Sequence, residues 1–540
     1  MKKLLFSLLF VIVANIGMLC AATYSGTCGE KLNWSFDDET SVLNITGSGA
    51  MTNWNAGENV PWYSIHLKIK SIVFPEGLTT IGNYAFLRCY SLASIELPQS
   101  LTAVGSYSFS KCTKLSSIVI PDGVISIGAK AFSECSAVTS ISIPGSVVSI
   151  GESAFYYCSA LTTIEIPTGI QSIGDKAFNS CGALTTISIP NTVQYIGEQA
   201  FTGCRVLTGV NIPASVTIIG ENAFSSCNAL NYINVNDGNP NYASEDGVLF
   251  DKNKETLILY PAGNARSSYT IPNSVTTIKQ RAFIYCRNLL SVTIPNNVTD
   301  IEDEAFIYCT SMTSINIPTG INEIGFEMLY GCSSLTSLKI PNNITSIGEA
   351  AMGWCSSLSS LILPAGITSI GNGAFYHCVS LTSVTCKSTT PPTIGEDVFG
   401  EMDTNIPLYV PAGSIELYQA ANGWSEFNNI LAIEEIATQE GEYNILYIDK
   451  NSEELHNETA TLHVPVAPTI EGFTFLRWDV IAGQLSDGIV IQAIYTANVP
   501  TEAPAAYTNP ANPAQKLIRN GNVYILTGDK TYTVTGQEVK

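Results

Sequence analysis

The side chains best suited to chemistry in this chain are cysteines that recur every 23 residues. Thiols at a fixed spacing can form disulfides, bind a metal ion or pack as small apolar groups. Two runs keep this spacing, and their members are Cys89, Cys112, Cys135, Cys158, Cys181, Cys204 and Cys227, then Cys286, Cys309, Cys332, Cys355 and Cys378.

The spacing argues against disulfides and against metal binding. A short fixed period is typical of a solenoid, in which equivalent residues of neighbouring units lie about 4.8 Å apart with parallel side chains. Parallel Cβ directions suit a disulfide poorly, and the runs contain no Cys-x-x-Cys pair and no histidine in register. The sequence therefore predicts an inward ladder of free thiols. Cys28 and Cys386 lie outside this ladder and can also be free.

Residues that commonly catalyse reactions are few and lack partners. There are 4 histidines. His377 occupies a repeat position that other units fill with tyrosine, which indicates a surface residue, and His456 and His463 flank an acidic segment without a serine or cysteine motif. The sequence has no G-x-S-x-G, no H-E-x-x-H and no phosphate-binding glycine loop. We therefore expect no catalytic, cofactor-binding or metal-binding residues, and no enzyme.

Binding is expected instead on outward-facing positions between buried ones. This candidate ligand face is polar, mostly uncharged and poor in aromatic residues. Protein-binding hot spots favour Trp, Tyr and Arg, so two interpretations stay open: the face binds a partner, or it keeps a β surface soluble. Its members are Ser94, Glu96, Ser140, Ser142, Thr163, Glu165, Thr186, Ser188, Tyr232 and Asn316.

The elements that position these residues follow from the repeated unit L-x-x-I-x-I-P-x-x-V-x-x-I-G-x-x-A-F-x-x-C. Alternation around Ile164 and Ile166 predicts a short strand with one buried face, and Pro167 marks its end. Gly174 is expected to permit a turn, and Phe178 to fill the widest part of the coil. The predicted fold is a β-rich repeat solenoid, in which each unit is stabilised by stacking on its neighbours.

The register is interrupted once, because Cys227 and Cys286 are 59 residues apart. The extra residues, 236–263, read as a turn-rich hairpin insertion with Asn239, Tyr242 and Asp246 as candidate binding residues. Insertions in repeat proteins map to one face and loops often bind ligands. A structural bulge is the alternative.

Composition divides the chain into segments. Residues 1–22 read as a signal peptide, 23–70 as an N-terminal β cap, 71–403 as the repeats and 404–433 as a C-terminal cap. Residues 434–442 read as an acidic linker, 443–497 as a small β domain, 498–513 as a second linker and 514–540 as a terminal β segment.

Net charge and hydropathy limit the partners. A net charge of −21 argues against nucleic acid and anionic membrane surfaces as partners. Beyond the signal segment, no stretch has the roughly 18 apolar residues that a membrane span needs. We expect an exported protein at the cell surface or secreted.

The unit Leu184-Thr-Thr-Ile-Ser-Ile-Pro190, with Ile196-Gly197 and Ala200-Phe201-Thr-Gly-Cys204, resembles BspA-type leucine-rich repeats of bacterial surface proteins. The resemblance implies a curved, right-handed leucine-rich-repeat-like array. One departure is that Ser100, Gly123, Ser146 and Gly169 occupy the place of the asparagine ladder of other leucine-rich repeats.

Two further resemblances concern the C-terminal part. Residues 471–478, Glu-Gly-Phe-Thr-Phe-Leu-Arg-Trp, are similar to Listeria–Bacteroides repeats, which implies a small β-grasp-like domain. The final 25 residues resemble C-terminal signals of type IX secretion, which implies sorting to the outer membrane surface.

The family resemblance implies adhesion to protein partners on host matrix, host cells or other bacteria. An alternative is a glycan-capture module of a nutrient-uptake system. Sugar sites need aromatic platforms, so alignment of Tyr156, Tyr157, Tyr285, Tyr308 and Tyr376 in one exposed groove would favour that alternative.

Overall fold

The computed structural model describes residues 24–433 in full, and beyond them the strands at 438–448, 454–465, 473–481, 490–497, 515–519, 522–527, 530–533 and 538–539. The signal peptide predicted for residues 1–22 and the linker predicted for 498–513 lie outside the described residues. The chain forms two units, Met1–Ile433 and Glu434–Lys540. Each is described by itself.

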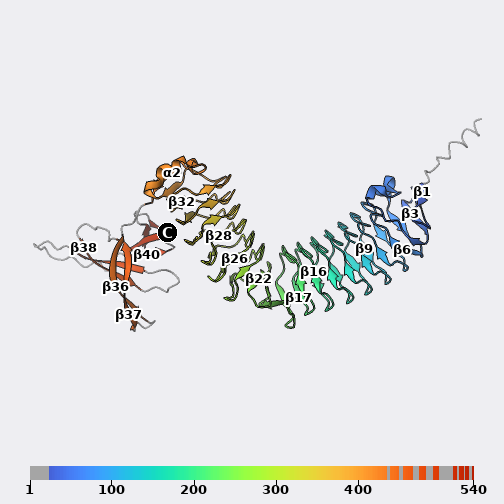
Figure 1. The fold of residues 1–540 in the computed structure, drawn as a ribbon, viewed down its shortest axis with the longest axis horizontal. Coiled ribbons are helices and arrows are strands. Elements are labelled where there is room, and N and C mark those ends of the chain that lie inside the picture. The colour runs from blue at the N-terminus through green and yellow to red at the C-terminus, as the bar shows by residue number, and fades with distance from the viewer. Residues whose placement is uncertain are drawn as a thin grey trace, which may run out of the picture. The chain divides into compact units, whose positions relative to one another are not determined.

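The first unit is a stack of β coils (Figure 1). One coil comprises β13 (Thr163–Glu165), β14 (Ser172–Ile173) and a turn at residues 174–181. Both strands pair in parallel with the equivalent strands one repeat later, Thr163 with Thr186 and Ile173 with Ile196. Each coil therefore contributes a strand to a first strand face and to a second strand face, and a turn to a third, here named the turn face. These coils confirm the predicted β-rich repeat solenoid.

The remaining strands of the first half follow the same pattern. The first strand face contains β5 (Ser71–Val73), β7 (Ser94–Ile95), β9 (Ser117–Val119), β11 (Ser140–Ser142), β15 (Thr186–Ser188), β17 (Gly209–Ile212) and β19 (Tyr232–Val235). The second contains β6 (Leu78–Ile81), β8 (Ala103–Val104), β10 (Ser126–Ile127), β12 (Ser149–Ile150), β16 (Tyr195–Ile196) and β18 (Ile218–Ile219).

The second half resumes the coil after the break. Its first strand face contains β23 (Ser268–Thr270), β25 (Ser291–Thr293), β27 (Ser314–Ile315), β30 (Ser360–Leu363) and β32 (Ser383–Cys386). Its second contains β24 (Thr277–Ile278), β26 (Asp300–Ile301), β28 (Glu323–Ile324), β29 (Ser346–Ile347), β31 (Ser369–Ile370) and β33 (Thr393–Ile394).

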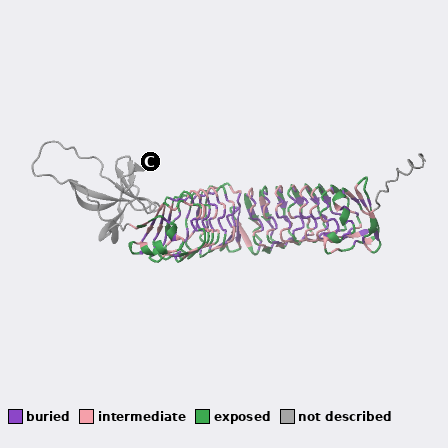
Figure 2. Cartoon of the chain, turned by 90° about the horizontal axis from the view of Figure 1, so that it is seen from above, coloured by how far each residue is buried: buried purple, intermediate pink, exposed green. Residues whose placement is uncertain are grey.

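The core runs along the inside of the coils, where buried residues recur in every repeat (Figure 2). Phenylalanine rings stack from coil to coil, for example Phe155 on Phe178 with ring centroids 5.4 Å apart. Most of these rings are fully buried beside an alanine, as Phe178 is beside Ala177, whose small side chain leaves room for the ring. Repetition of the A-F pair therefore produces one continuous apolar column in each half.

The cysteines line the same interior as free thiols, and all fourteen described cysteines are buried. From Cys112 onward, each ladder thiol donates to a carbonyl of a neighbouring coil, as Cys158 Sγ does to Phe132 O at 3.3 Å. Burial disfavours the thiolate and raises the pKa of Cys158 to about 12. The structure thus confirms the predicted ladder, and Cys28 and Cys386 are free and buried as well.

Gly174 is needed for a different reason from the one predicted. No positive φ is found there; instead, a Cβ on Gly174 would lie 2.7 Å from Ile150 O and 2.8 Å from Glu152 N of the preceding coil. A side chain is therefore excluded at this position because the backbone of the preceding coil lies too close, and not because of the turn geometry. The left-handed conformations fall on other residues of the turn, such as Lys176 and Ser180.

A cap covers each end of the solenoid. The N-terminal cap contains β1 (Tyr24–Thr27), β2 (Leu32–Asp37), β3 (Val42–Gly47), β4 (Gly49–Ala50) and the 3₁₀ helices η1 (Gly57–Asn59) and η2 (Tyr63–Lys68). Trp62 stacks on Phe86 at 5.4 Å and donates its indole N–H to Ala85 O at 2.7 Å. This indole closes the phenylalanine column at its first coil.

The C-terminal cap also closes the column with a tryptophan. It contains β34 (Pro407–Val410), η3 (Ala412–Ser414), α2 (Ile415–Ala420), η4 (Trp424–Glu426) and β35 (Asn429–Ala432). Trp424 is fully buried, lies 5.5 Å from Phe399 and donates to Pro392 O at 2.9 Å. Within the described residues, no helix is long and apolar enough to cross a membrane.

The second unit contains two antiparallel sheets. One is β36 (Thr438–Ile448) with β37 (Glu454–Pro465). The other joins β38 (Phe473–Ile481), β39 (Val490–Ala497), β40 (Gln515–Arg519), β41 (Asn522–Thr527), β42 (Lys530–Thr533) and β43 (Glu538–Val539).

These strands differ from the predicted segments in two ways. Strand β36 begins at Thr438, so the second part of the expected linker 434–442 is strand. Pairing of Ile491 with Lys516 places the small β domain and the terminal segment in one sheet. The β-grasp-like fold and the sorting role of the terminal segment stay predictions.

Candidate functional site

The coil pattern breaks where the cysteine spacing breaks. A hairpin of β20 (Tyr242–Glu245) and β21 (Val248–Asp251) is followed by the antiparallel β22 (Thr256–Leu259). Strand side chains alternate between faces, so Leu249 packs in the core of the first half while Val248 and Phe250 pack in that of the second. The insertion is therefore a partition between two hydrophobic cores.

The partition also caps the edge of the first half, here named the first-half edge (residues 213–235). Asn239 is fully buried, and its amide donates to Pro213 O at 2.9 Å and to Val216 O at 2.8 Å. Tyr242 Oη accepts the N–H of Ile219 at 2.8 Å. These side chains replace the backbone partners that the next coil would have supplied.

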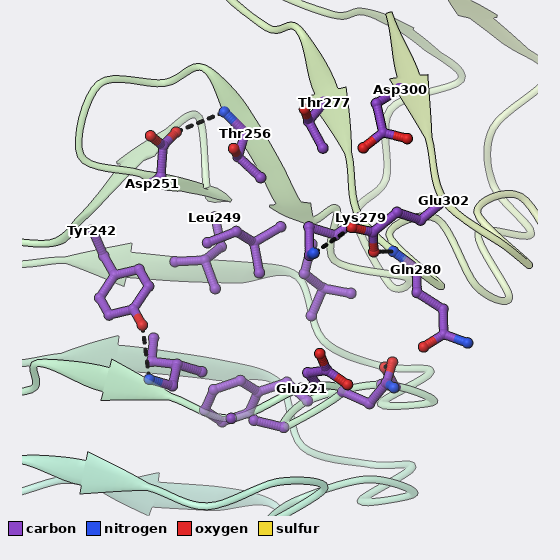
Figure 3. Close-up of a pocket in the computed structure, with 18 residues that line it drawn as sticks. Glu221, Tyr242, Leu249, Asp251, Thr256, Thr277, Lys279, Gln280, Asp300 and Glu302 are labelled. Atoms are coloured by element: carbon purple, nitrogen blue, oxygen red, sulfur yellow. Dashed lines mark hydrogen bonds and ion pairs between the residues drawn. The ribbon is translucent and has the colours of Figure 1, made fainter.

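A pocket of about 430 Å³ lies where the partition meets the turn face (Figure 3). Its apolar wall includes Ile219, Leu249 and Ile258. The first half contributes the turn that follows β18, and the second half contributes residues from β22, β24 and β26 and from the turns after the last two. Polar side chains therefore line the pocket from both sides of the break: some belong to the last turn of the first half and others to the first coils of the second half.

The charges in the pocket are mainly negative. Lys279 forms an ion pair with Glu302, which also accepts the backbone N–H of Gln280 at 2.8 Å. Glu221 and Asp300 are exposed at opposite sides of the pocket and have no ion-pair partner among residues 24–433. The one lysine of the pocket is thus paired with Glu302, whereas Glu221, Asp251 and Asp300 have no ion-pair partner among residues 24–433. This excess of negative charge favours a cationic ligand group.

The three residues predicted in the insertion have three different roles. Asn239 is buried and serves the fold, so it is not available to a ligand. Tyr242 is half-buried and lines the pocket. Asp246 is exposed and pairs with Arg266 at 3.1 Å. The structure therefore brings only Tyr242 of this set into the pocket.

All ten residues of the candidate ligand face are exposed. Parallel pairing places Ser140, Thr163 and Thr186 in one row, and Glu165 beside Ser188 in another. The residues of the candidate ligand face on β11, β13 and β15 therefore lie side by side, because these strands belong to one sheet.

Two members of the candidate ligand face contact other residues of the protein through their side chains. Asn316 accepts the N–H of Ile294 at 2.8 Å and donates to Ile294 O at 2.7 Å, so its amide holds the neighbouring coil. The ring of Tyr232 lies over Gly209, where a Cβ would approach it to 2.3 Å.

Sequence reasoning missed Glu221, Thr277, Lys279 and Asp300. These residues occupy ordinary repeat positions on either side of the insertion, and their register alone gave no sign of a pocket. Asp300 gave no clear signal either, because this repeat position varies and holds Tyr195, Glu323 and Ser346 in other coils.

The tyrosines named for a sugar site lie on the turn face in two groups. Tyr156 lines a groove of about 700 Å³ in the first half, together with Tyr84, Tyr107 and several lysines. In the second half Tyr285 stacks on Tyr308 at 5.2 Å. No ring contact joins the two groups among residues 24–433, so the tyrosines do not form the single row that would have favoured a sugar site.

Among the described residues, no group of three or more His, Cys, Asp or Glu could hold a metal ion. The two histidines within residues 24–433 lie apart from the pocket, His66 stacked on Tyr63 and His377 on Trp354.

A solenoid of short parallel strands, stacked coil on coil and interrupted once, defines a repeat protein. A family model of the BspA type leucine rich repeat region matches residues 62–182, 125–245, 263–382 and 349–443. The chain belongs to this family. The matched ranges leave out residues 246–262, which fall in the partition.

Solved structures show the same fold. A leucine rich cell surface protein of Faecalibacterium prausnitzii A2-165 is 31% identical, with a TM-score of 0.56, and the match covers 67% of this chain and 94% of that chain. The pneumococcal vaccine antigen PcpA is 20% identical, with a TM-score of 0.54, and the match covers 76% of this chain and 98% of that chain. No curated protein matches the sequence.

Proposed function

We propose that this chain is a non-catalytic protein of the cell surface that binds protein partners through its first strand face. Membership of the BspA type family and similarity to a leucine rich cell surface protein support the location. Extended repeat surfaces commonly serve as binding surfaces. The partners are proteins of host matrix, host cells or other bacteria.

One observation carries this proposal: the first strand face offers exposed polar side chains in straight rows over successive coils. Ser140, Thr163 and Thr186 repeat the same outward position on in-register strands. Such rows can contact a partner over many coils, each contact being weak. Exposure of Val119 and Ile362 adds apolar points to the face.

Binding of the full-length mature protein to immobilised matrix proteins and to bacterial cells tests the proposal. We expect a Thr163→Arg, Thr186→Arg double variant to bind at least tenfold more weakly, because two long charged side chains would interrupt the row. Both positions are exposed, so the fold should persist. Affinity is measured by surface plasmon resonance.

A matched control places arginine on the second strand face, at Ser126 and Gln171, which are also exposed. This variant should bind as the unmodified protein does. Equal loss of binding in both variants, or no saturable binding to any protein or cell, would contradict the proposal.

A second candidate function is glycan capture on the turn face, which one observation favours. The rings of Tyr308, Tyr330 and Tyr376 lie over Gly331, Gly353 and Gly400, where a Cβ would come within 2.6–3.0 Å of the ring atoms. Glycine thus lets each ring lie flat on the next coil. A glycan array that detects binding by the intact protein and none by a Trp354→Ala, Tyr376→Ala variant would support this function.

A further inference from the structure

The regular turns of the solenoid donate three backbone N–H groups each to the next coil, except the turn of Phe283, which donates those of Phe283 and Tyr285 alone. In the coil of Phe201, the N–H groups of Gln199, Phe201 and Gly203 donate to Glu221 O, Ala223 O and Ser225 O at 2.9, 2.8 and 3.0 Å. The residues before the alanine and before the cysteine have left-handed φ, 53° at Gln199 for example. This conformation aims alternate N–H groups along the solenoid axis.

At the break this set of donors has lost its acceptors. The N–H groups of Asn222, Phe224 and Ser226 have no hydrogen-bond partner among residues 24–433. Asn222 and Phe224 line the pocket, and Ser226 follows directly. The chain has turned away into the partition, so the coil that would have supplied the carbonyls is absent here.

The rest of the first-half edge is capped, which makes the open donors specific to the pocket. On the second strand face Tyr242 and Asn241 bond to Ile219 and Thr217. On the first strand face the N–H groups of Ile233 and Val235 donate to Gly247 O at 2.8 Å and Ser244 Oγ at 2.9 Å.

The final turn of the solenoid provides a comparison. Asp397, Phe399 and Glu401 also lack backbone acceptors within residues 24–433, as expected where a solenoid ends. There the rings of Trp424 and Phe427 pack against Phe399 at 5.5 and 5.1 Å. At the break, an open pocket lies in that place instead.

We propose that this pocket docks an extended polypeptide segment of a partner protein, whose carbonyl groups take the place of the missing turn and whose basic side chain lies between Glu221 and Asp300. The inference rests on the proposed protein-binding function and names the chemistry of the partner. Main-chain hydrogen bonds to an unpaired edge give affinity in this mode, and side-chain pockets give specificity.

The charges select a basic peptide over an anion. Backbone N–H donors would suit an anion by themselves. Glu221 and Asp300 oppose that choice, and the lysine of the pocket is already paired with Glu302. Uncharged carbonyl acceptors avoid this repulsion. The apolar wall of Ile219, Leu249 and Ile258 suits the aliphatic stem of lysine or arginine.

Hydrogen exchange and titration of the full-length protein test the proposal, with a short blocked peptide of alternating alanine and lysine as the probe. In the free protein we expect fast exchange at Asn222 and Phe224 compared with Gln199 and Phe201 one coil earlier. Saturating peptide should protect both amides. An alanine–glutamate peptide should bind at least tenfold more weakly.

Variants locate the binding. Thr277→Trp fills the pocket and should weaken peptide binding tenfold or more, whereas Ser369→Trp, at the same repeat position away from the pocket, should leave it unchanged. Glu221→Gln and Asp300→Asn should each weaken binding by up to about fivefold at low salt.

Three results would overturn the proposal: equal binding by the Thr277→Trp and Ser369→Trp variants, equal binding of the acidic peptide, or protection of Asn222 and Phe224 in the free protein. Protection of these two amides in the free protein would mean that another segment of the same chain already occupies the pocket. Failure of the lysine peptide to bind the unmodified protein, while partner binding through Thr163 and Thr186 is intact, would refute this inference and leave the proposed function standing.

Discussion

Each thiol of the ladder occupies a position where a small apolar group fits and a larger one does not. Cys158, for example, is fully buried and donates to the carbonyl of Phe132. Burial stabilises the protonated thiol and raises the pKa of Cys158, Cys227 and Cys378 to about 12. Because the thiolate is the reactive form, these cysteines should be inert while the coil is intact.

The raised pKa predicts a loss of stability at high pH. An unfolded cysteine ionises near its ordinary value of 9.0, whereas folded Cys158 stays protonated to about 12. Its contribution is therefore complete below pH 9 and is lost as the pH rises toward 12. Between pH 8 and pH 10, the unmodified protein should lose on the order of 1 kcal/mol more free energy of unfolding than a Cys158→Ala variant does.

Urea unfolding under reducing conditions at several pH values measures this difference. The Cys158→Ala substitution leaves a small cavity, which lowers the free energy of unfolding by the same amount at every pH. The comparison therefore uses only the slope of the free energy of unfolding against pH. Parallel pH profiles of the two proteins would contradict the prediction.

At the scale of elements, the partition has a structural task that its turn-rich sequence did not reveal. Asn239 bonds two carbonyls of the first-half edge, and its own oxygen accepts the N–H groups of Asn241 and Tyr242, both at 2.9 Å. Four groups thus depend on one buried side chain. Asn239 thus has the purely structural role that the alternative interpretation of the insertion, a structural bulge, predicts. Tyr242, in contrast, lines the pocket.

Replacing Asn239 should therefore loosen the edge. We expect Asn239→Ala to lower the free energy of unfolding of the first half by about 3 kcal/mol, because buried carbonyl and N–H groups would lose their partners. Urea denaturation gives the size of the effect and hydrogen exchange gives its place, at β18 and β20. An Asp246→Ala control removes only an exposed ion pair and should change stability much less; equal effects would refute the role of Asn239 as a cap.

Considering the whole first unit, the partition divides one repeat array into two cores. The phenylalanine column of the first half ends at Phe224, and the second begins at Tyr260, which stacks on Phe283 at 5.2 Å. Repeat proteins are stabilised by contacts between neighbours. The halves should therefore lose structure separately when one column is damaged.

Matched substitutions in the two columns test this division. Phe306→Ala and Phe155→Ala each remove a fully buried ring and should each cost about 3–5 kcal/mol. Hydrogen exchange should show lost protection mainly at residues 260–399 for the first variant and 62–227 for the second. Loss spread evenly over both halves would show that the partition couples the cores.

Much of this architecture could be predicted because the unit is repeated. The strand at Ile164 and Ile166, the buried Phe178 and the inward Cys181 each follow from a pattern that recurs many times, so a local ambiguity in one unit is resolved by the others. The prediction was incomplete where the pattern stops. The insertion was located, but its role as a partition and cap depends on contacts between residues distant in sequence.

Sequence alone determined the coil, its period, its buried and exposed positions and the place of its interruption, because each depends on the alternation of apolar residues along the chain. Tertiary structure decided what lies at the interruption. Only there do Glu221, Lys279 and Asp300 meet around a pocket, and only there do the N–H groups of Asn222 and Phe224 lose their acceptors. Hydrogen bonds between coils join residues about 20 or more positions apart, and an unpaired donor becomes visible only when the neighbouring coil is in place.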